Sequence, residues 1–163
     1  MTVKVGLPPV ARADARLFIL GSLPGDASLA AKRYYAYPHN AFWRLVGTVI
    51  GEDLAALDYD TRLDRLVENR IGLWDVIARA SRRGSLDQAI RDAGHNPLAD
   101  FFASFPDLEA VAFNGTAAAL AGRKLLGALP ITLIDLPSSS PANTRPLEDK
   151  AQAWARLSEY CGK

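Results

Sequence analysis

A cluster of aromatic and amide side chains near the start of the chain has the most distinctive chemistry. Tyr35 and Tyr37 stand just before Asn40, within the segment YYAYPHNAFW at residues 34–43. An aromatic ring can stack on a flat ligand, and a side-chain amide can both donate and accept hydrogen bonds at its edge. The combination indicates a planar ligand such as a nucleobase. The alternatives are core packing for the tyrosines and, for Asn40, the N-cap of the following helix, which position alone favours.

Three loops rich in glycine, serine and asparagine each follow an apolar run. They are GSLPGDAS at residues 21–28, NGT at 114–116 and LPSSSPANT at 136–144. Their main-chain N–H groups are of the kind that bind phosphate, although ordinary turns have the same composition. Asn114 either occupies a turn or presents its amide to the edge of a base. Because ligands bind beyond the carboxyl ends of parallel strands, the loops are predicted to meet at one edge of a sheet.

Hydrophobic periodicity predicts the elements that position these loops. Buried strands are expected at residues 17–20, 108–113 and 131–136, and a further short apolar segment covers 71–76. Helices are expected at residues 41–50, 59–70, 97–104, 116–126 and 147–160, with a helix start at 85–87 and a polar loop at 79–84. Strands that alternate with helices indicate an α/β domain with a mainly parallel sheet.

Composition limits the class of protein. The 163 residues suit one domain, and 49% hydrophobic with 23% charged residues is typical of a globular protein. The net charge of +1 gives no overall basic field, so binding of nucleic acid would require a local basic patch. Arg79, Arg82 and Arg83 are either such a patch or a solvated basic face. The single cysteine, Cys161, excludes an intrachain disulfide, a cysteine-rich zinc site and an iron–sulfur cluster.

Several other classes are disfavoured by missing patterns. The glycine spacings of the common nucleotide-binding loops are absent, and the two histidines stand near no carboxylate cluster that would complete a metal site. Ser22 does not lie in a G-x-S-x-G elbow, which makes an esterase using Ser22 or Ser138 remote. The chain has no secretory signal and no apolar run near the roughly 20 residues of a membrane span. We therefore expect a cytoplasmic protein with no membrane contact.

Taken together, the segments resemble the uracil-DNA glycosylase superfamily, and within it the hypoxanthine-DNA glycosylase branch. The resemblance depends on the order and spacing of several pieces along nearly the whole chain. They are GSLPG at 21–25, SL at 28–29, YYAYPHNAFW at 34–43, GLWDV at 72–76, GSLD at 84–87, FNG at 113–115 and LPSSSPAN at 136–143.

The resemblance implies a fold and an activity. The fold would be a three-layer α/β/α sandwich with a central, mainly parallel four-stranded sheet, as a single domain over residues 1–163. The activity would be hydrolysis of the N-glycosidic bond of a deaminated base flipped out of DNA. Nothing in the sequence marks a buried lysine for Schiff-base chemistry, since Lys32 lies in a polar run, so no strand cleavage is expected. Hypoxanthine, uracil and xanthine remain open as the base. The implied partner is DNA alone, with no cofactor, metal or obligate protein partner, and the chain is expected to be a monomer.

The resemblance also assigns roles to individual residues. Asn40 matches a catalytic asparagine, Tyr35 the ring that stacks on the base, and Asn114 a base contact after a strand. Further base contacts are expected from Gly21, Ser22 and Leu23. Contacts with DNA are expected from Pro24, His39, Ser138, Ser139, Ser140, Pro141, Ala142 and Asn143.

One position departs from the family pattern. Several relatives carry a water-activating Asp or Asn as the third residue of the first motif, where this chain has Leu23. An apolar side chain can neither orient nor deprotonate water, so Asn40 is the nearest candidate for that role. The competing interpretation is a non-catalytic nucleotide- or nucleic-acid-binding α/β module in which Asn40 only caps a helix.

Overall fold

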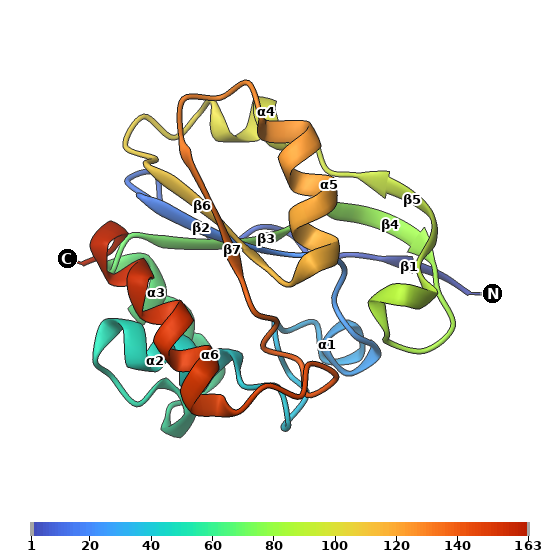
Figure 1. Ribbon diagram of the computed structural model, residues 1–163, viewed down its shortest axis with the longest axis horizontal. Helices are drawn as coiled ribbons and strands as arrows, with labels where there is room; N and C mark the ends of the chain where they lie inside the picture. Colours follow the sequence, from blue (N-terminus) through green and yellow to red (C-terminus); the bar gives the residue numbers. More distant parts are fainter. Residues whose placement is uncertain (1, 163) are drawn as a thin grey trace.

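The structure, a computed structural model, describes residues 2–162. A four-stranded parallel sheet lies at its centre, in the order β3-β2-β6-β7 (Figure 1). Its strands are β2 (Leu17–Gly21), β3 (Ile71–Asp75), β6 (Ala110–Asn114) and β7 (Thr132–Leu136). Every residue of β2, β3 and β6 is buried, because strands covered on both faces need apolar residues at successive positions. The predicted four-stranded parallel sheet is confirmed.

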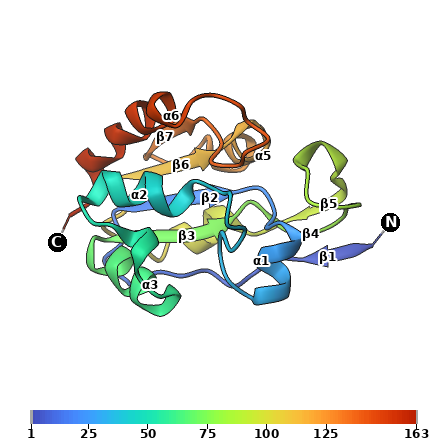
Figure 2. The ribbon, with the colours of Figure 1, turned by 90° about the horizontal axis from the view of Figure 1, so that it is seen from below.

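Helices cover both faces of this sheet, which gives three layers (Figures 1 and 2). One face is covered by α2 (Phe42–Ile50), α3 (Tyr59–Glu68) and α6 (Leu147–Trp154), and the other by α4 (Leu98–Phe102) and α5 (Thr116–Leu126). Successive residues of β2 alternate between the two cores: Ile19 packs with Phe42, and Phe18 packs with Phe113. The predicted three-layer α/β/α architecture is confirmed.

A second, antiparallel sheet corrects one sequence prediction. It consists of β1 (Val3–Val5), β4 (Ile77–Ser81) and β5 (Arg91–His95), in the order β1-β4-β5. The expected polar loop at residues 79–84 was therefore wrong for Arg79 to Ser81, which belong to β4. Ile77 and Ala80 are buried while Arg79 is exposed, and register shifts interrupt the pairing with β5. These irregularities hide the alternation that marks a strand.

The remaining elements are short. They are α1 (Asp26–Ala31), η1 (Leu54–Ala56), η2 (Asp87–Ala89) and η3 (Ala155–Tyr160). The helix start predicted at residues 85–87 is a single 3₁₀ turn, η2. The helix predicted over 147–160 is α-helical to Trp154 and continues as η3. No helix within residues 2–162 has the length and apolar character needed to cross a bilayer.

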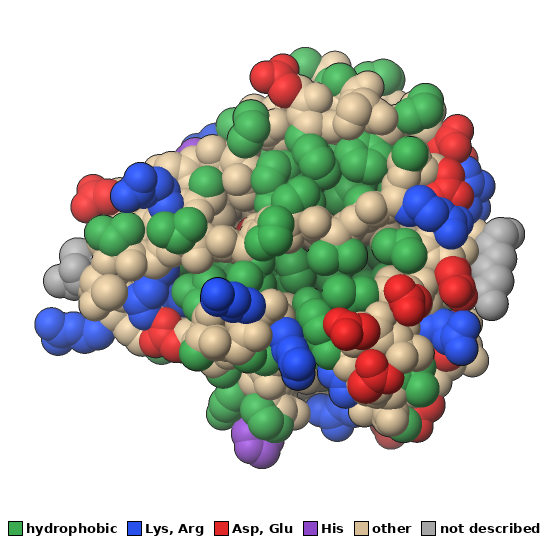
Figure 3. All heavy atoms as spheres, turned by 180° about the vertical axis from the view of Figure 1, so that it is seen from behind, with side chains coloured by type: hydrophobic (Ala, Val, Ile, Leu, Met, Phe, Trp, Pro, Cys, Tyr) green, Lys and Arg blue, Asp and Glu red, His purple; other side chains and the backbone are tan. Residues whose placement is uncertain are grey.

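The outer edge of β3 is covered by the chain itself. Val10 donates to and accepts from Leu73, at N···O distances of 2.9 and 2.8 Å. Pairing of this kind leaves fewer free N–H and C=O groups for association with another chain. Figure 3 shows the molecule from behind, where apolar side chains gather in the middle of the face and charged side chains surround them.

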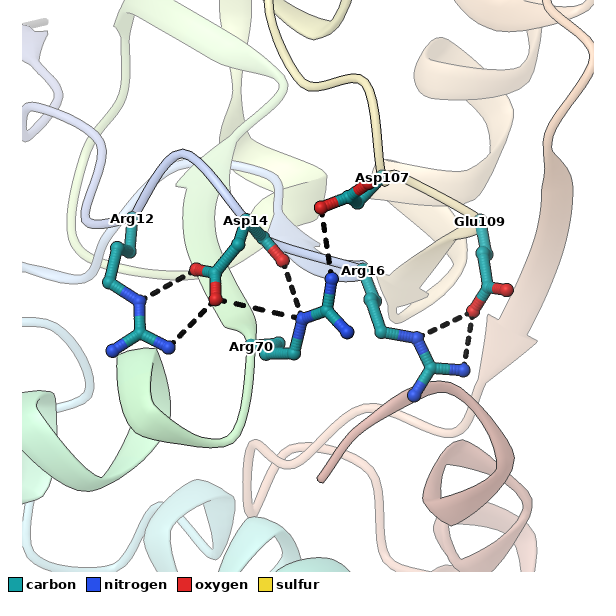
Figure 4. Close-up of polar contacts among 6 residues, drawn as sticks. All are labelled: Arg12, Asp14, Arg16, Arg70, Asp107 and Glu109. Carbon is teal, nitrogen blue, oxygen red and sulfur yellow. Dashed lines mark hydrogen bonds and ion pairs between the residues drawn. The ribbon is translucent and has the colours of Figure 1, made fainter. Parts of the chain in front are cut away.

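The amino ends of the strands carry a group of ion pairs (Figure 4). Arg16, which precedes β2, pairs with Glu109, which precedes β6, at 2.6 Å. Arg70, which precedes β3, lies 3.0 Å from Asp107 and 3.7 Å from Asp14. These side chains are partly exposed, so each pair contributes little to stability.

Candidate active site

The loops that follow β2, β6 and β7 meet at the carboxyl edge of the sheet. The Ser139 main-chain N–H donates to Asn114 Oδ1 at 2.9 Å, and Asn114 Nδ2 donates to Ser139 Oγ at 2.9 Å. The Ala41 N–H donates to Ser139 O at 3.0 Å, which joins the aromatic segment to the same loop. Asn114 Nδ2 also lies 3.4 Å from Tyr35 Oη. At the end of β2, a Cβ atom on Gly21 would lie 3.2 Å from the same hydroxyl, so the three strand ends meet at one edge as predicted. Asn40 directly precedes Ala41, which is bonded to this edge.

Tyr35 is held in a strained and well-defined place. Its φ is 53°, in the left-handed region that a tyrosine seldom adopts. One face of its ring stacks on Phe42, with centroids 3.8 Å apart and planes 10° from parallel. Burial raises the pKa of the Tyr35 hydroxyl well above its usual value, so the hydroxyl stays protonated. Strain at a residue fixed by so many contacts is typical of functional sites.

Asn40 lies two residues before Phe42, the first residue of α2, and its side chain makes one local contact. Its Oδ1 accepts a hydrogen bond from the Phe42 N–H at 2.9 Å. This contact satisfies a free donor at the helix start, as the capping interpretation expects, although Ala41 rather than Asn40 occupies the N-cap position. Among residues 2–162 the Asn40 NH₂ group has no hydrogen-bond partner, so that donor and one lone pair of Oδ1 remain available.

Asn114 is buried and ties the loop after β7 to the sheet. The amide makes two hydrogen bonds with one residue, Ser139, one through its oxygen and one through its nitrogen. This arrangement fixes the position of the main chain at Ser139, which in turn receives the Ala41 N–H. The sequence predicted a base contact for Asn114. In the structure the same amide also holds the loop after β7 in place through Ser139.

The loop after β2 is anchored by the β4–β5 hairpin. The fully buried guanidinium of Arg82 donates to Leu23 O, Pro24 O and Gly84 O, at 3.3, 2.6 and 2.8 Å. The interpretation of Arg82 as part of a phosphate patch or a solvated face is therefore wrong, while Arg83 beside it is exposed. The sequence interpretation of Arg82 was wrong because its hydrogen-bond partners include carbonyl groups of a distant loop, and the residues around Arg82 in the sequence do not indicate this contact.

The side chains of that first loop face the protein interior. Leu23 packs in a small core with Ile77 and Ala80, and Pro24 is also buried. Ser22 is buried, and its Oγ donates to Asp87 Oδ1 at 2.6 Å. A ligand at this loop would therefore meet mainly main-chain groups.

A buried carboxyl group that the sequence analysis did not single out ends β3. Asp75 is 3% exposed, and burial together with the charge of Asp87 raises its pKa to about 7. Within the described residues, Asp75 Oδ2 is buried without a hydrogen-bond partner. Perturbed and unsatisfied groups of this kind are enriched in functional sites. The GLWDV and GSLD segments contain Asp75 and Asp87, but their roles depend on contacts between distant parts of the chain.

The loop at residues 138–143 is held from beneath by a buried lysine. Lys150, in α6, donates from Nζ to Ser140 O at 3.1 Å and to Asn143 O at 2.8 Å. Burial lowers the pKa of its ammonium group, and nearby Arg145 lowers it further. Pro141 and Ala142 are exposed between the two anchored carbonyls. The loop therefore presents a fixed main chain to solvent.

Replacing Lys150 with methionine is expected to lower the free energy of unfolding by about 2–3 kcal/mol, because two partly buried carbonyls lose a charged donor. Urea unfolding would measure the loss. Hydrogen exchange at the Ser139 N–H should also speed up as the loop loosens. The exposed Lys124 in α5 gives the matched control, since Lys124→Met should change stability by less than about 0.5 kcal/mol. Equal stability of the two variants would contradict the anchoring role.

Two further aromatic side chains form an exposed corner next to the site. Tyr37 is exposed, and its ring makes an edge contact with His39 at 5.4 Å between centroids. The Tyr37 carbonyl accepts the Asn40 N–H at 3.0 Å, so the corner is tied to the start of α2. His39, predicted to contact DNA, is thus placed at the surface beside Asn40.

Comparisons with known proteins agree with this arrangement. The family model described as "Uracil DNA glycosylase superfamily" matches residues 8–158. Proteins named hypoxanthine DNA glycosylase from Methanosarcina barkeri and Methanosarcina acetivorans are each 41% identical over 152 residues, covering 93% of this chain and 96% of theirs. A solution NMR structure of a candidate uracil DNA glycosylase from Methanosarcina acetivorans has a TM-score of 0.87 and 39% identity, covering 96% of this chain and 97% of that one. The chain belongs to the uracil-DNA glycosylase superfamily, as the sequence motifs indicated.

Proposed function

We propose that this chain is a DNA glycosylase that hydrolyses the N-glycosidic bond of a deaminated base flipped out of DNA. The observation that carries the proposal is the hydrogen-bonded network that joins Tyr35, Asn114 and Ser139 to the Asn40 segment. Membership of the superfamily supports the reaction class. The relatives named hypoxanthine DNA glycosylase support hypoxanthine as the preferred base, with uracil as the second candidate.

Base departure builds negative charge on the base and positive charge on the sugar, so catalysis requires groups that stabilise both charges as they develop. Phe42 already stacks on one face of the Tyr35 ring, and we assign the other face to the flipped base. Main-chain N–H groups of the loop at residues 21–23 are the candidate donors to the leaving base. Asn114 Nδ2 already donates to Ser139 and Tyr35, so Asn114 would contact the base through the second lone pair of Oδ1.

We assign to Asn40 the role of positioning the water that attacks the sugar. Its Oδ1 keeps a second lone pair that can accept a water hydrogen, while the Phe42 N–H holds the amide in one orientation. An amide is a weak base, but an oxocarbenium-like sugar needs a positioned water more than a strong nucleophile. The apolar Leu23 is buried away from the site and takes no part in this step.

DNA contacts are assigned to the exposed surface around this position. The loop at residues 138–143 would approach the backbone through its exposed Pro141 and Ala142 and its partly exposed Ser138, Ser140 and Asn143, with His39 beside it. The buried Ser139 would hold this loop in place. Lys150 is committed to two carbonyl oxygens, which supports a glycosylase that releases the base without forming an imine with the sugar. We also propose that the protein acts as a monomer.

The test is a panel of duplex oligonucleotides, each with one deoxyinosine, deoxyuridine or deoxyxanthosine, incubated with excess protein. We expect release of hypoxanthine, leaving an abasic site that breaks only after alkali treatment. Strand cleavage without alkali would contradict the monofunctional assignment. Tight binding of these duplexes with no base released from any of them would indicate a non-catalytic binding module instead of an enzyme.

A further inference from the structure

Asp75 ends β3 at the carboxyl edge of the sheet. It pairs in register with Gly21 of β2, and Asn114 ends β6 on the other side of β2. A Cβ atom on Gly21 would lie 2.6 Å from Asp75 Oδ1 and 3.2 Å from Tyr35 Oη. The carboxyl and the hydroxyl thus fill the space that glycine leaves, and Tyr35 Oη also receives Asn114 Nδ2 at 3.4 Å. The Asp75 carboxyl therefore lies next to the Tyr35–Asn114 pair, across the space that Gly21 leaves open.

The surroundings of Asp75 favour its uncharged form. Oδ2 is buried with no partner among the described residues, so an ionised carboxylate would lack the hydrogen bonds that it requires. Asp87 of η2 adds a negative charge on one side, while Arg82, after β4, opposes it with a positive charge. The other titratable groups facing Asp75 are the hydroxyls of Tyr34 and Tyr35, which are neutral because burial raises both of their pKa values.

We propose that Asp75 keeps its proton during the reaction, so that the base departs beside a neutral carboxyl group. The inference rests on the proposed function. The departing base carries negative charge, and an ionised carboxylate at this edge of the sheet would repel it through a medium of low dielectric constant. The neutral carboxyl instead adds no charge to the space beside Gly21 that it shares with the Tyr35 hydroxyl. Asp75 thus acts through its lack of charge.

The first test is the pH profile of single-turnover hypoxanthine release. Burial and Asp87 raise the pKa of Asp75 to about 7, so the wild-type rate constant should fall about tenfold per pH unit above neutrality. Asp75→Asn has nearly the same shape and cannot ionise, so it should retain the wild-type rate at pH 6 and lose the alkaline fall. An unchanged alkaline fall in Asp75→Asn would overturn the proposal, as would loss of release at every pH in a variant that thermal unfolding shows to be folded.

A second measurement needs no activity and no variant. In the wild-type protein with ¹³C-labelled aspartate, one side-chain carboxyl carbon should titrate near neutral pH, far above the ordinary aspartate value of about 3.9. Titration of every aspartate near that ordinary value would overturn the proposal. A neutral Asp75 in a protein that releases no base from any duplex would instead reject the proposed function, so the two failures can be told apart.

Discussion

Single-turnover release of hypoxanthine is expected to slow by about 10²- to 10³-fold in the Asn40→Ala variant. Alanine has neither the carbonyl oxygen assigned to the water nor the free NH₂ group of Asn40. The substitution also removes the acceptor for the Phe42 N–H, which should cost about 1 kcal/mol of stability. The rate would be measured with enzyme in excess over a deoxyinosine duplex, and the stability by urea unfolding.

A variant at a second helix start provides the control that distinguishes a catalytic role of Asn40 from a capping role. Asp58 is the N-cap of α3, and its side chain accepts the Thr61 N–H at 3.3 Å. Asp58→Ala should lose a similar amount of stability while it releases hypoxanthine at the wild-type rate. If Asn40→Ala also stays within about twofold of the wild-type rate, Asn40 only supports the start of α2 and the water must be held by another group.

The largest loss of stability is expected from Arg82→Met, which should lower the free energy of unfolding by about 3–5 kcal/mol. The guanidinium is 0% exposed and donates to three carbonyl oxygens, two of them in the loop after β2. Methionine fills part of the space but leaves those oxygens without a donor, which is costlier than the loss of an exposed ion pair. Urea unfolding at neutral pH measures the difference.

Arg83 provides the matched control for this prediction. It follows Arg82 directly and is exposed, so Arg83→Met should change stability by less than about 0.5 kcal/mol. The loop after β2 should also exchange its amide hydrogens faster in Arg82→Met than in Arg83→Met. Similar unfolding curves for the two variants would mean that the loop does not depend on the buried guanidinium.

The sequence by itself determined the central sheet, its layers and the family. Apolar runs predicted β2, β6 and β7 within two residues at each end, and the small-residue helix over 116–126 matches α5. Such elements are predictable because burial on both faces of a strand, or on one side of a helix, imposes a regular local pattern. Asn40 and Asn114 were identified beside such elements, whereas Tyr35 was identified from the aromatic and amide motif at residues 34–43.

Only the tertiary structure decided which polar side chains are buried and what they contact. Asp75, Arg82 and Lys150 look like ordinary charged residues in the sequence. In the fold Asp75 is buried against the end of β2, and Arg82 and Lys150 donate to carbonyl oxygens of other loops. The same limit hid β4, because its pairing with β1 and β5 joins distant segments across register shifts. The pKa and the hydrogen-bond partners of a charged side chain change when other segments of the chain exclude water from it. That exclusion is a property of the assembled fold, which no local pattern of residues records.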